Sequence, residues 1–347
     1  MIKIDNMSKI LDNIEPFNEI FYKNCFYDAL FPIIRHFNRP ELAFTANNLF
    51  FYDLDTSQPL INFKHHTIHF VPENDLYNLL GIGIINKTSS SDIIRDLITA
   101  VNNDRPVIIY IDCFYESIRP DAYNKNHFPH TILIYGYDSK EKNFHILEHN
   151  YRESYLYEKR TISYLDIVNS YHGYLENLFE DHSHQSYCEF YLKRDTSFYI
   201  NDDICKKFYV DKLLENEQRL IYGLDYLKLF IEKFMNITDK ESILLECMSD
   251  LLKVLYEIIT NKKLERYIVL KLFTKPSFIV LCNSIINTYT CIRGIISKFK
   301  LSMQYDSRSF KKAAEKLMII YQLEKSWYNN LFSLCRIFEK EGKLSNG

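Results

Sequence analysis

The stretch NHFPHTILIYGYDSKEKNFHILEHN, residues 126–150, carries four of the chain's eleven histidines close to an acidic residue. Apolar and polar residues alternate on both sides of the sequence DSK, which predicts a β-hairpin. With a three-residue turn centred on Ser139, His130 faces Glu148 across this hairpin. An imidazole held by a carboxylate can act as a general base, because the acceptor fixes the tautomer and stabilises the imidazolium. The sequence therefore predicts the orienting half of a nucleophilic triad.

The apolar pattern of the hairpin also predicts its register. Ile134 faces Phe144, and the apolar side chains of both strands share one buried face. A shift of one residue would mix apolar and polar side chains on both faces, which a half-buried sheet resists. A shift of two residues would bring Asn150 opposite His130, so Asn150 is the alternative partner of the imidazole.

Cys25 is the candidate nucleophile for this base. It lies at the start of a predicted helix that runs to Phe37, with Asn24 as the N-cap and Asp28 in the first turn. Unpaired backbone amides and the helix macrodipole favour a thiolate at such a position and lower the pKa of the thiol. On spacing alone, a small buried hydrophobic residue is the more common role of an isolated cysteine.

The order of these residues resembles the papain-like fold, and especially bacteriocin-processing peptidases, in which a cysteine opens a helix and, about a hundred residues later, a histidine, GYD, a turn and an acidic residue follow. More specifically, NCFYDAL and RPVIIYIDCFYESIRPDAYNKNHFPHTILIYGYD resemble the butirosin biosynthesis acyltransferase family over roughly residues 15–150. The resemblance implies a papain-like domain in which Cys25 is the nucleophile and His130 the base. Glu148 stands where such enzymes usually have Asp.

The resemblance also implies the reaction. The family moves an acyl or peptidyl group from a carrier-protein thioester, through a cysteine acyl-enzyme, to a small amine in specialised-metabolite (antibiotic) biosynthesis. The phosphopantetheine belongs to the donor carrier protein, and no cofactor bound by the enzyme is expected. A thioester donor makes amide formation favourable without ATP, in agreement with a sequence that has no GxxxxGK phosphate loop. A papain-like cysteine peptidase or thioesterase is the alternative, because it shares the first half-reaction.

Further residues are candidates for the predicted site. Papain-like peptidases have a glutamine before the cysteine as an oxyanion donor, and the nearby amides here are Asn18 and Asn24. An aromatic cleft would exclude water from the acyl group. Its candidate lining residues, for which core packing is an equal explanation, are Tyr27, Tyr115, Tyr123 and Phe128. Arg119 is expected to form an ion pair with Asp121, or else to contact the donor's phosphopantetheine or the amine.

A zinc site is the third interpretation of the histidine-rich hairpin. Its candidate ligands are His127, His130, His145, His149 and Cys113. In the predicted register His130 and His145 point to opposite faces, and His127 precedes the strand. At most two of these side chains would therefore converge with Glu148, whereas zinc usually takes three or four protein ligands. No metal site is predicted.

The chain has two parts with different periodicity. Residues 1–199 mix helical and strand patterns and are expected to form an α+β, papain-like acyltransferase domain with an antiparallel sheet, whose strands include residues 106–112 and 186–193. From about residue 200 apolar residues recur every three or four positions, which predicts an all-α domain over residues 200–347. The roles expected of this helical region are packing and the contacts of a homodimer.

Composition argues against several partners. The chain carries 42 basic and 45 acidic residues, a formal net charge of −3 and no block of like charge, so neither nucleic acid nor an anionic membrane is expected. Its eight cysteines form no CxxC pattern and its start has no secretory-signal pattern, which predicts a cytoplasmic protein with reduced thiols. Polar residues interrupt the most apolar stretch, residues 278–296, so a buried helix is expected there rather than a membrane span.

Overall fold

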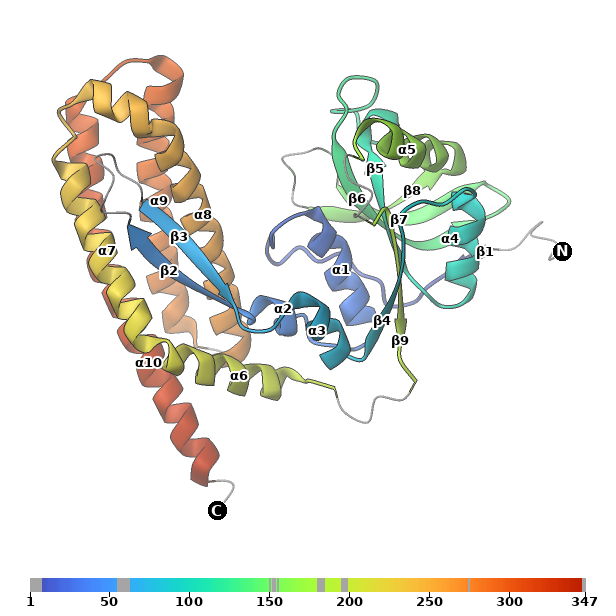
Figure 1. The fold of residues 1–347 in the computed structure, drawn as a ribbon, viewed down its shortest axis with the longest axis horizontal. Coiled ribbons are helices and arrows are strands. Elements are labelled where there is room, and N and C mark those ends of the chain that lie inside the picture. Colours follow the sequence, from blue (N-terminus) through green and yellow to red (C-terminus); the bar gives the residue numbers. More distant parts are fainter. Residues whose placement is uncertain are drawn as a thin grey trace. The chain divides into compact units, whose positions relative to one another are not determined.

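The computed structural model describes residues 8–54, 63–149, 151, 154, 156–179, 185–194, 199–273 and 275–344. The chain divides into two compact units, one made of residues 1–43 and 73–201 and the other of residues 44–72 and 202–347 (Figure 1). The first unit combines helices with an antiparallel sheet, and helices predominate in the second. The predicted helical character of the C-terminal region is confirmed.

The first unit is an antiparallel sheet with helices packed on it. Its strands are β1 (Ser8–Ile10), β4 (Ile82–Lys87), β5 (Val107–Asp112), β6 (Pro129–Asp138), β7 (Asn143–His149), β8 (Tyr157–Ser163) and β9 (Tyr187–Leu192). Its helices are α1 (Cys25–His36), α3 (Glu73–Leu79), α4 (Ile93–Asn102), α5 (Tyr164–Asn177) and the short 3-10 helix η1 (Cys113–Tyr115). The strand order is β4-β9-β5-β6-β7-β8, with β1 beside β6 and every pairing antiparallel. The predicted antiparallel sheet is therefore confirmed.

Strand β6 lies at the centre of this sheet. One of its edges pairs with β5 and β1 in succession, and the other pairs with β7. Every residue from His130 to Tyr137 is buried, which requires cover on both faces of the strand. Helix α1 packs on one side and α4 on the other, where the Tyr137 hydroxyl donates to Asn102 at 2.8 Å (Figure 1). A well-covered strand therefore carries the predicted base near its start.

The β6–β7 hairpin has a different register from the predicted one. Near the site Ile134 pairs with Ile146 instead of Phe144, a shift of two residues. Asn150, the alternative partner predicted for His130, lies outside the described residues. The apolar face is kept, because a shift of two leaves every side chain on its own side of the sheet.

The turn of this hairpin explains the shift. Asp138 pairs with Asn143, so the loop holds four residues and not three. The Asp138 carboxylate accepts the backbone N–H groups of Lys140 and Glu141, at 2.9 and 3.0 Å, and thereby fixes the loop. This longer loop alone would turn the apolar residues outward, and a β-bulge just before Gly136 restores the alternation. Neither the longer loop nor the bulge is visible in the apolar pattern.

The second unit is a set of long helices with a β-hairpin packed on it. The helices are α6 (Asp202–Glu215), α7 (Glu217–Met235), α8 (Glu241–Phe273), α9 (Pro276–Ser302) and α10 (Ser307–Leu344), and the hairpin consists of β2 (Asn48–Leu54) and β3 (Phe63–His69). A short helix, α2 (Leu42–Thr45), precedes the hairpin. The predicted boundary near residue 199 is close to the observed one, but a continuous first domain over residues 1–199 is wrong. Residues 44–72 belong to the helical unit, which is therefore not all-α.

Aromatic packing explains why the hairpin joins the helices. Phe63 of β3 stacks on Phe230 of α7 with ring centroids 4.2 Å apart, and Tyr52 of β2 stacks on Phe63 at 5.4 Å. Gly223 lets α7 approach the strand closely, since a Cβ there would lie 3.1 Å from the Tyr52 backbone nitrogen. All three rings are buried, and each such ring stabilises the folded state by about 1.5–3 kcal/mol. A hairpin exposed to water would lose this contribution.

A buried ion network ties the hairpin to three helices. The Lys262 ammonium on α8 lies 2.7 Å from a carboxylate oxygen of Glu265 and 2.7 Å from one of Glu324 on α10. Tyr52 on β2 donates its hydroxyl to Glu324, and the Tyr289 hydroxyl on α9 lies 3.1 Å from that of Tyr52. Lys262 and Glu324 are fully buried, and charges removed from water need such partners. The network therefore links β2, α8, α9 and α10.

Helix α9 contains the apolar stretch that predicted a buried helix. By length and composition it could cross a membrane, with a mean hydropathy of 1.4 in its most apolar window, of which 33% is buried. One side of this helix is buried. Its buried residues recur at helical spacing and include Cys282, Ile285, Tyr289, Ile292 and Ile296. The helix packs against α8 and α10. It is therefore buried along one side only.

Replacing Lys262 by alanine is expected to destabilise the helical unit by about 3–5 kcal/mol, because two carboxylates would stay buried without their counter-charge. Urea unfolding followed by the fluorescence of Trp327, the chain's one tryptophan, measures this change, since Trp327 is buried in the same unit. Lys263→Ala is the matched control, because Lys263 is exposed, and should change the free energy of unfolding by less than about 0.5 kcal/mol. Equal stability of the two variants would contradict the role given to the network.

Candidate active site

Helix α1 begins at Cys25 because Asn24 caps it. Asn24 has an extended backbone (φ −159°, ψ 177°), and its side-chain oxygen accepts the N–H of Phe26 at 3.0 Å. The helix was predicted to run from Cys25 to Phe37 and runs from Cys25 to His36, so its start is confirmed. Cys25 therefore occupies the first helical position, where backbone N–H groups lack partners within the helix.

The Cys25 thiol makes hydrogen-bond contacts with His130, the predicted base, and with the Thr131 backbone. Burial raises the pKa of the thiol, but the hydrogen bond and positive charge of His130 outweigh it and lower the pKa of Cys25 from 9.0 to about 7. The side chain keeps partial access to solvent. The structure thus brings the predicted nucleophile and base together, with a substantial thiolate fraction at neutral pH.

Glu148 holds the other side of the His130 ring. The ring Nε2 lies 3.0 Å from one carboxylate oxygen of Glu148 and 3.2 Å from the other. Burial lowers the pKa of His130, yet the charge of Glu148 and the contact with Cys25 raise it well above its ordinary value. Because Nε2 faces the carboxylate, Nδ1 is the ring nitrogen left to contact the thiol. The imidazolium is therefore the stable form beside the Cys25 thiolate.

His130 contacts Glu148, as predicted, although the register of the β6–β7 hairpin differs from the predicted one. In the observed register Glu148 lies two residues from the position opposite His130, on the same face of the sheet. Diagonal neighbours of this kind are about 7–8 Å apart across the strands. Glutamate reaches further than aspartate by one methylene group and so spans the diagonal. The longer side chain at this position therefore fits the shift of two residues.

Arg119 fixes the Glu148 carboxylate from behind. Its Nη1 donates to Glu148 at 3.1 Å, and its Nε and Nη2 donate to the two Asp121 oxygens, both at 3.0 Å. Burial raises the pKa of Glu148, but the charges of His130 and Arg119 hold it below its ordinary value. The ion pair with Asp121 is confirmed. The Arg119 side chain is fully buried, so its assignment to the substrate cleft is wrong, and it is a positioning residue.

His149 is stacked between His130 and Tyr157. The planes of the two imidazoles differ by 6° at a centroid distance of 4.8 Å, and the Tyr157 ring lies 4.9 Å from His149. His149 Nε2 accepts a hydrogen bond from Arg119 at 2.9 Å, and Nδ1 donates to the Ser154 carbonyl at 3.1 Å. Burial, with the charges of His130 and Arg119, lowers the pKa of His149 to about 4. His149 is therefore neutral at pH 7. It fixes the plane of the His130 ring by stacking and adds no second positive charge beside it.

The cluster of His130, Glu148 and His149 does not suit a metal ion. One ligand atom from each residue lies within 4.8 Å of the others, as a metal site would require. However, Arg119 Nη1 donates to both Glu148 and His149, so a guanidinium occupies the place of the cation. Arginine is not deprotonated in proteins, and this side chain is fully buried. The arrangement is an ion-pair network that supports an imidazole.

Asp28 is a second buried acid near Cys25, almost one helical turn after it. It is 3% exposed and accepts a hydrogen bond from the Tyr157 hydroxyl. Burial and the negative charge of Cys25 raise the pKa of Asp28 to about 8, so the carboxyl is mostly neutral at pH 7. The protonated acid therefore avoids a second negative charge beside the thiolate.

Asn18 has a structural role at strand β8. Its amide nitrogen donates to the Tyr157 carbonyl at 3.0 Å, and its oxygen accepts the Tyr157 N–H at 2.9 Å. This two-point contact holds strand β8 beside the segment that precedes α1. One amide N–H of Asn18 is therefore engaged by strand β8, and its assignment as an oxyanion donor stays a prediction, while Asn24 uses its side-chain oxygen to cap α1.

The tyrosines predicted to line one cleft have separate surroundings. Tyr27 is buried and donates its hydroxyl to Glu73. The Tyr115 ring packs directly onto Gly173 of α5, where a Cβ would clash with it. Tyr123 is 39% exposed. These three tyrosines therefore make different contacts, and their role as lining residues of one cleft stays a prediction.

Two other rings lie near Cys25. Phe26 and Tyr110 of β5 stack with centroids 6.3 Å apart, and Tyr174 of α5 lies 5.5 Å from Tyr110. Burial raises the pKa of Tyr110, and the negative charges of Cys25 and Glu73 add to this effect. The Tyr110 hydroxyl therefore lies within electrostatic reach of both groups. No local pattern singles out Tyr110, because its strand reads as an ordinary buried strand.

The two remaining histidines of the hairpin region lie apart from this network. His127 Nδ1 is 2.6 Å from an Asp112 oxygen, and its ring stacks on Phe114 at 4.1 Å. His145 lies on β7 with its ring 6.2 Å from that of Tyr135. Of the four histidines, only two therefore converge with a carboxylate at the site.

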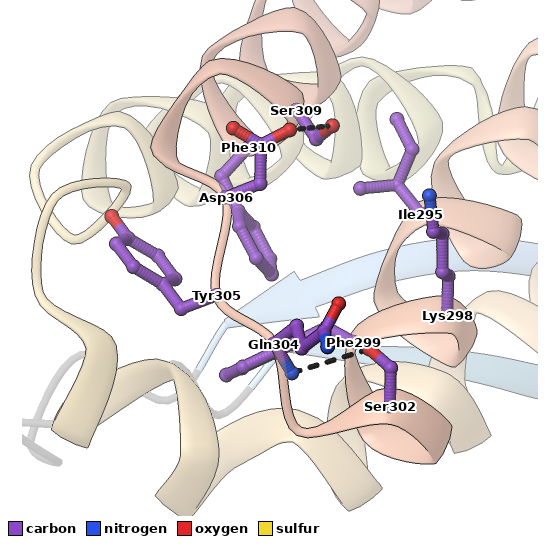
Figure 2. A pocket seen from close by; sticks show the side chains of 9 residues that line it. All are labelled: Ile295, Lys298, Phe299, Ser302, Gln304, Tyr305, Asp306, Ser309 and Phe310. Atoms are coloured by element: carbon purple, nitrogen blue, oxygen red, sulfur yellow. Dashed lines mark hydrogen bonds between the residues drawn. The ribbon is translucent and has the colours of Figure 1, made fainter.

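A cavity of about 300 Å³ belongs to the helical unit, between the end of α9 and the start of α10 (Figure 2). Its lining residues are Ile295, Lys298, Phe299, Ser302, Gln304, Tyr305, Asp306, Ser309 and Phe310. Figure 2 shows that its polar groups bind one another, with Ser309 donating to Asp306 at 2.7 Å and the Gln304 N–H donating to Ser302 at 3.2 Å. These hydrogen bonds serve the turn between the two helices, so the cavity is not assigned any chemistry.

No protein-family model matches the chain, and no curated protein matches it significantly. A functional assignment therefore depends on the geometry around Cys25, His130 and Glu148 and on the resemblance of the sequence motifs.

Iodoacetamide should alkylate Cys25 at a rate that rises with pH and reaches half its maximum near pH 7, because only the thiolate reacts. Below that pH the thiol binds its proton and the rate falls. Peptide mass spectrometry gives the rate at each cysteine, and the exposed Cys291 is an internal reference. If Cys25 reacts no faster than Cys291 at pH 7, the thiolate–imidazolium pair is wrong.

Glu148→Ala should move the midpoint of this alkylation profile upward by about one pH unit or more. Loss of the carboxylate lowers the pKa of His130, and a neutral ring stabilises the Cys25 thiolate less. Glu158→Ala is the matched control, because Glu158 pairs with Glu148 across the strands but is exposed. Equal midpoints in the two variants would show that Glu148 does not support the imidazolium.

Asp28→Asn should stabilise the protein increasingly as the pH rises. The wild-type carboxyl keeps its proton up to about pH 8 in the folded chain, against an ordinary pKa of 3.8, so wild-type stability is lost as the pH rises through this window. Asparagine has a similar size and does not ionise, so its advantage over wild type should grow by roughly 1–3 kcal/mol between pH 5 and pH 8. Urea denaturation at both pH values measures this, and a constant difference would rule out a buried neutral acid.

Proposed function

We propose that this chain is an acyltransferase that forms amide bonds through a Cys25 acyl-enzyme. The donor is an acyl or peptidyl group on the phosphopantetheine of a carrier protein, and the acceptor is a small amine. The observation that carries the proposal is the series of contacts from Cys25 through His130 to the buried Glu148, which lowers the pKa of the thiol to about 7. Such a thiolate is an effective nucleophile at neutral pH.

The proposed fold of the first unit is papain-like. In support, a helix that begins at the nucleophile packs on an antiparallel sheet, the base lies near the start of the central strand, and its carboxylate partner lies on the next strand. The segments NCFYDAL and HFPHTILIYGYD, which resemble the butirosin-type acyltransferase family, coincide with the start of α1 and with β6. Motif and geometry therefore favour the same residues.

In the first half-reaction the Cys25 sulfur attacks the carbonyl carbon of the donor thioester. The backbone N–H of Cys25, at the start of α1, is the proposed donor to the tetrahedral oxyanion. Collapse of this intermediate breaks the bond between carbon and the pantetheine sulfur, and the His130 imidazolium gives its proton to that sulfur. The acyl group is then a thioester on Cys25, and His130 is neutral.

In the second half-reaction a neutral amine attacks the acyl group on Cys25. His130 takes the proton from the attacking nitrogen, the carbon–sulfur bond to Cys25 breaks, and the thiolate–imidazolium pair is restored. One thioester and one amine thus give one amide and one free thiol, with no need for ATP. Glu148 and Arg119 keep the ring in place through both steps.

A cysteine peptidase or thioesterase would share the first half-reaction and use water in the second. The rings of Phe26 and Tyr110 beside the half-buried Cys25 limit the access of water to an acyl group there. This shielding and the sequence resemblance favour an amine as the acceptor.

Intact-protein mass spectrometry after incubation with an acylated carrier protein tests the proposal. We expect a mass increase equal to the acyl group, located on Cys25, which is lost as an amide when a small amine is added. Cys25→Ala should show no such adduct and should lower transfer at least about a thousandfold, because the nucleophile is missing. Cys291→Ala is the matched control and should behave like the wild type.

Two results would contradict this assignment. An adduct on Cys25 that yields only free acid in the presence of amines would identify a thioesterase or peptidase instead. A chain whose Cys25 reacts with iodoacetamide but takes up no acyl group from carriers with different acyl chains would refute acyl transfer from such donors.

A further inference from the structure

Three side chains near the nucleophile form a group that suits a positive charge. This group, the ammonium cage, consists of the rings of Tyr22 and Tyr27 and the carboxylate of Glu73. The two rings meet edge to face with centroids 4.8 Å apart, and the Tyr27 hydroxyl donates to Glu73. Aromatic faces combined with a carboxylate attract organic ammonium ions.

The ammonium group of Lys23 occupies this cage. Lys23 Nζ lies 5.2 Å from the Tyr22 ring centroid and 5.1 Å from that of Tyr27. It is 3.4 Å from the Tyr27 hydroxyl and 3.4 Å from a Glu73 oxygen, whereas charge-assisted hydrogen bonds are normally about 2.7–2.9 Å long. Lys23 therefore fills the cage without a close contact to either oxygen.

The backbone at Lys23 does not explain why a lysine is found there. Its φ is 55°, in the left-handed region that glycine or asparagine adopts more easily than lysine. The Lys23 side chain is 34% exposed and that of Glu73 is 39% exposed. Both charged groups would therefore remain solvated if they separated. The lysine ammonium can therefore leave the cage at low cost.

The cage and the nucleophile are connected by two stacked rings. Around the first turn of α1, Phe26 lies between Cys25 and Tyr27, and its ring stacks on Tyr110 at 6.3 Å. The charges of Cys25 and Glu73 both contribute to the raised pKa of Tyr110. A flexible molecule that lies over these rings can place one end in the cage and the other at the sulfur.

We propose that the ammonium cage binds the distal ammonium group of a diamine acceptor, and that Lys23 fills the cage while no acceptor is bound. The inference rests on the proposed function and names the acceptor class as a chain with two amines. The charged end anchors the molecule in the cage, and the neutral end attacks the acyl group on Cys25. Lys23 is a built-in competitor for the same cage.

Calorimetric titration of the full chain with 1,4-diaminobutane, without an acyl donor, tests the cage separately from the chemistry. Binding should weaken about tenfold or more in Glu73→Gln, because the charged partner of the ammonium is lost. Asp75→Asn is the matched control, since Asp75 is an exposed acid on the same helix α3, and it should bind like the wild type. The uncharged 1,4-butanediol should not bind.

Lys23→Met should change the affinity in the opposite direction. Methionine keeps an unbranched apolar side chain over the tyrosine rings but carries no charge, so the affinity for 1,4-diaminobutane should rise severalfold. A lower affinity in Lys23→Met, or equal affinities in Glu73→Gln and Asp75→Asn, would overturn the cage.

Transfer assays separate this inference from the proposed function. With an acylated carrier, the wild type should have a lower KM for 1,4-diaminobutane than for 4-amino-1-butanol, whose second end is uncharged, and Glu73→Gln should remove this difference. An acyl group on Cys25 with equal KM values for the two amines would overturn the diamine assignment and leave acyl transfer intact. Diamine binding without any acyl group on Cys25 would refute the proposed function instead.

Discussion

The buried charge of Glu148 is the constraint on which the geometry of the first unit depends. A carboxylate with no exposure is stable only when donors surround it. Here the His130 ring, the Arg119 guanidinium and the His149 backbone N–H, at 2.7 Å, all point at it. These donors come from β6, from the loop after η1 and from the end of β7. Satisfying one buried charge therefore brings three segments together and orients the imidazole.

The same charge determines ionisation further along the network. Through the His130 imidazolium it stabilises the Cys25 thiolate, whose pKa falls to about 7, while the pKa of Asp28 on the same helical turn rises to about 8. Both acids are mostly buried, but only the thiol makes a hydrogen bond with the imidazolium. Direct contact with His130, more than burial, therefore decides which of the two groups is charged at neutral pH.

Local patterns predicted the parts of the site that local structure determines, namely the capped helix at Cys25 and the pairing of His130 with Glu148. The pair was found although the register was wrong, because a shift of two residues is invisible to an alternation with a period of two. The role of Arg119 in fixing Glu148 and the contact of Asn18 with β8 join residues far apart in the chain, and no periodicity encodes them. Membership of residues 44–72 in the helical unit has the same cause, since it depends on rings that meet only in the fold.

Two cations of the first unit, Arg119 and Lys23, differ in how easily they can move. Arg119 is structural, whereas Lys23 is proposed to leave the ammonium cage when a ligand binds. Arg119 is fully buried and donates to Glu148 and Asp121 at 3.0–3.1 Å, so its displacement would leave a buried carboxylate without its counter-charge. Lys23 is partly exposed, its two polar contacts are 3.4 Å long, and Glu73 would stay solvated without it. Moving Lys23 therefore costs far less free energy than moving Arg119. A ligand ammonium that makes closer contacts than Lys23 has only this small cost to offset.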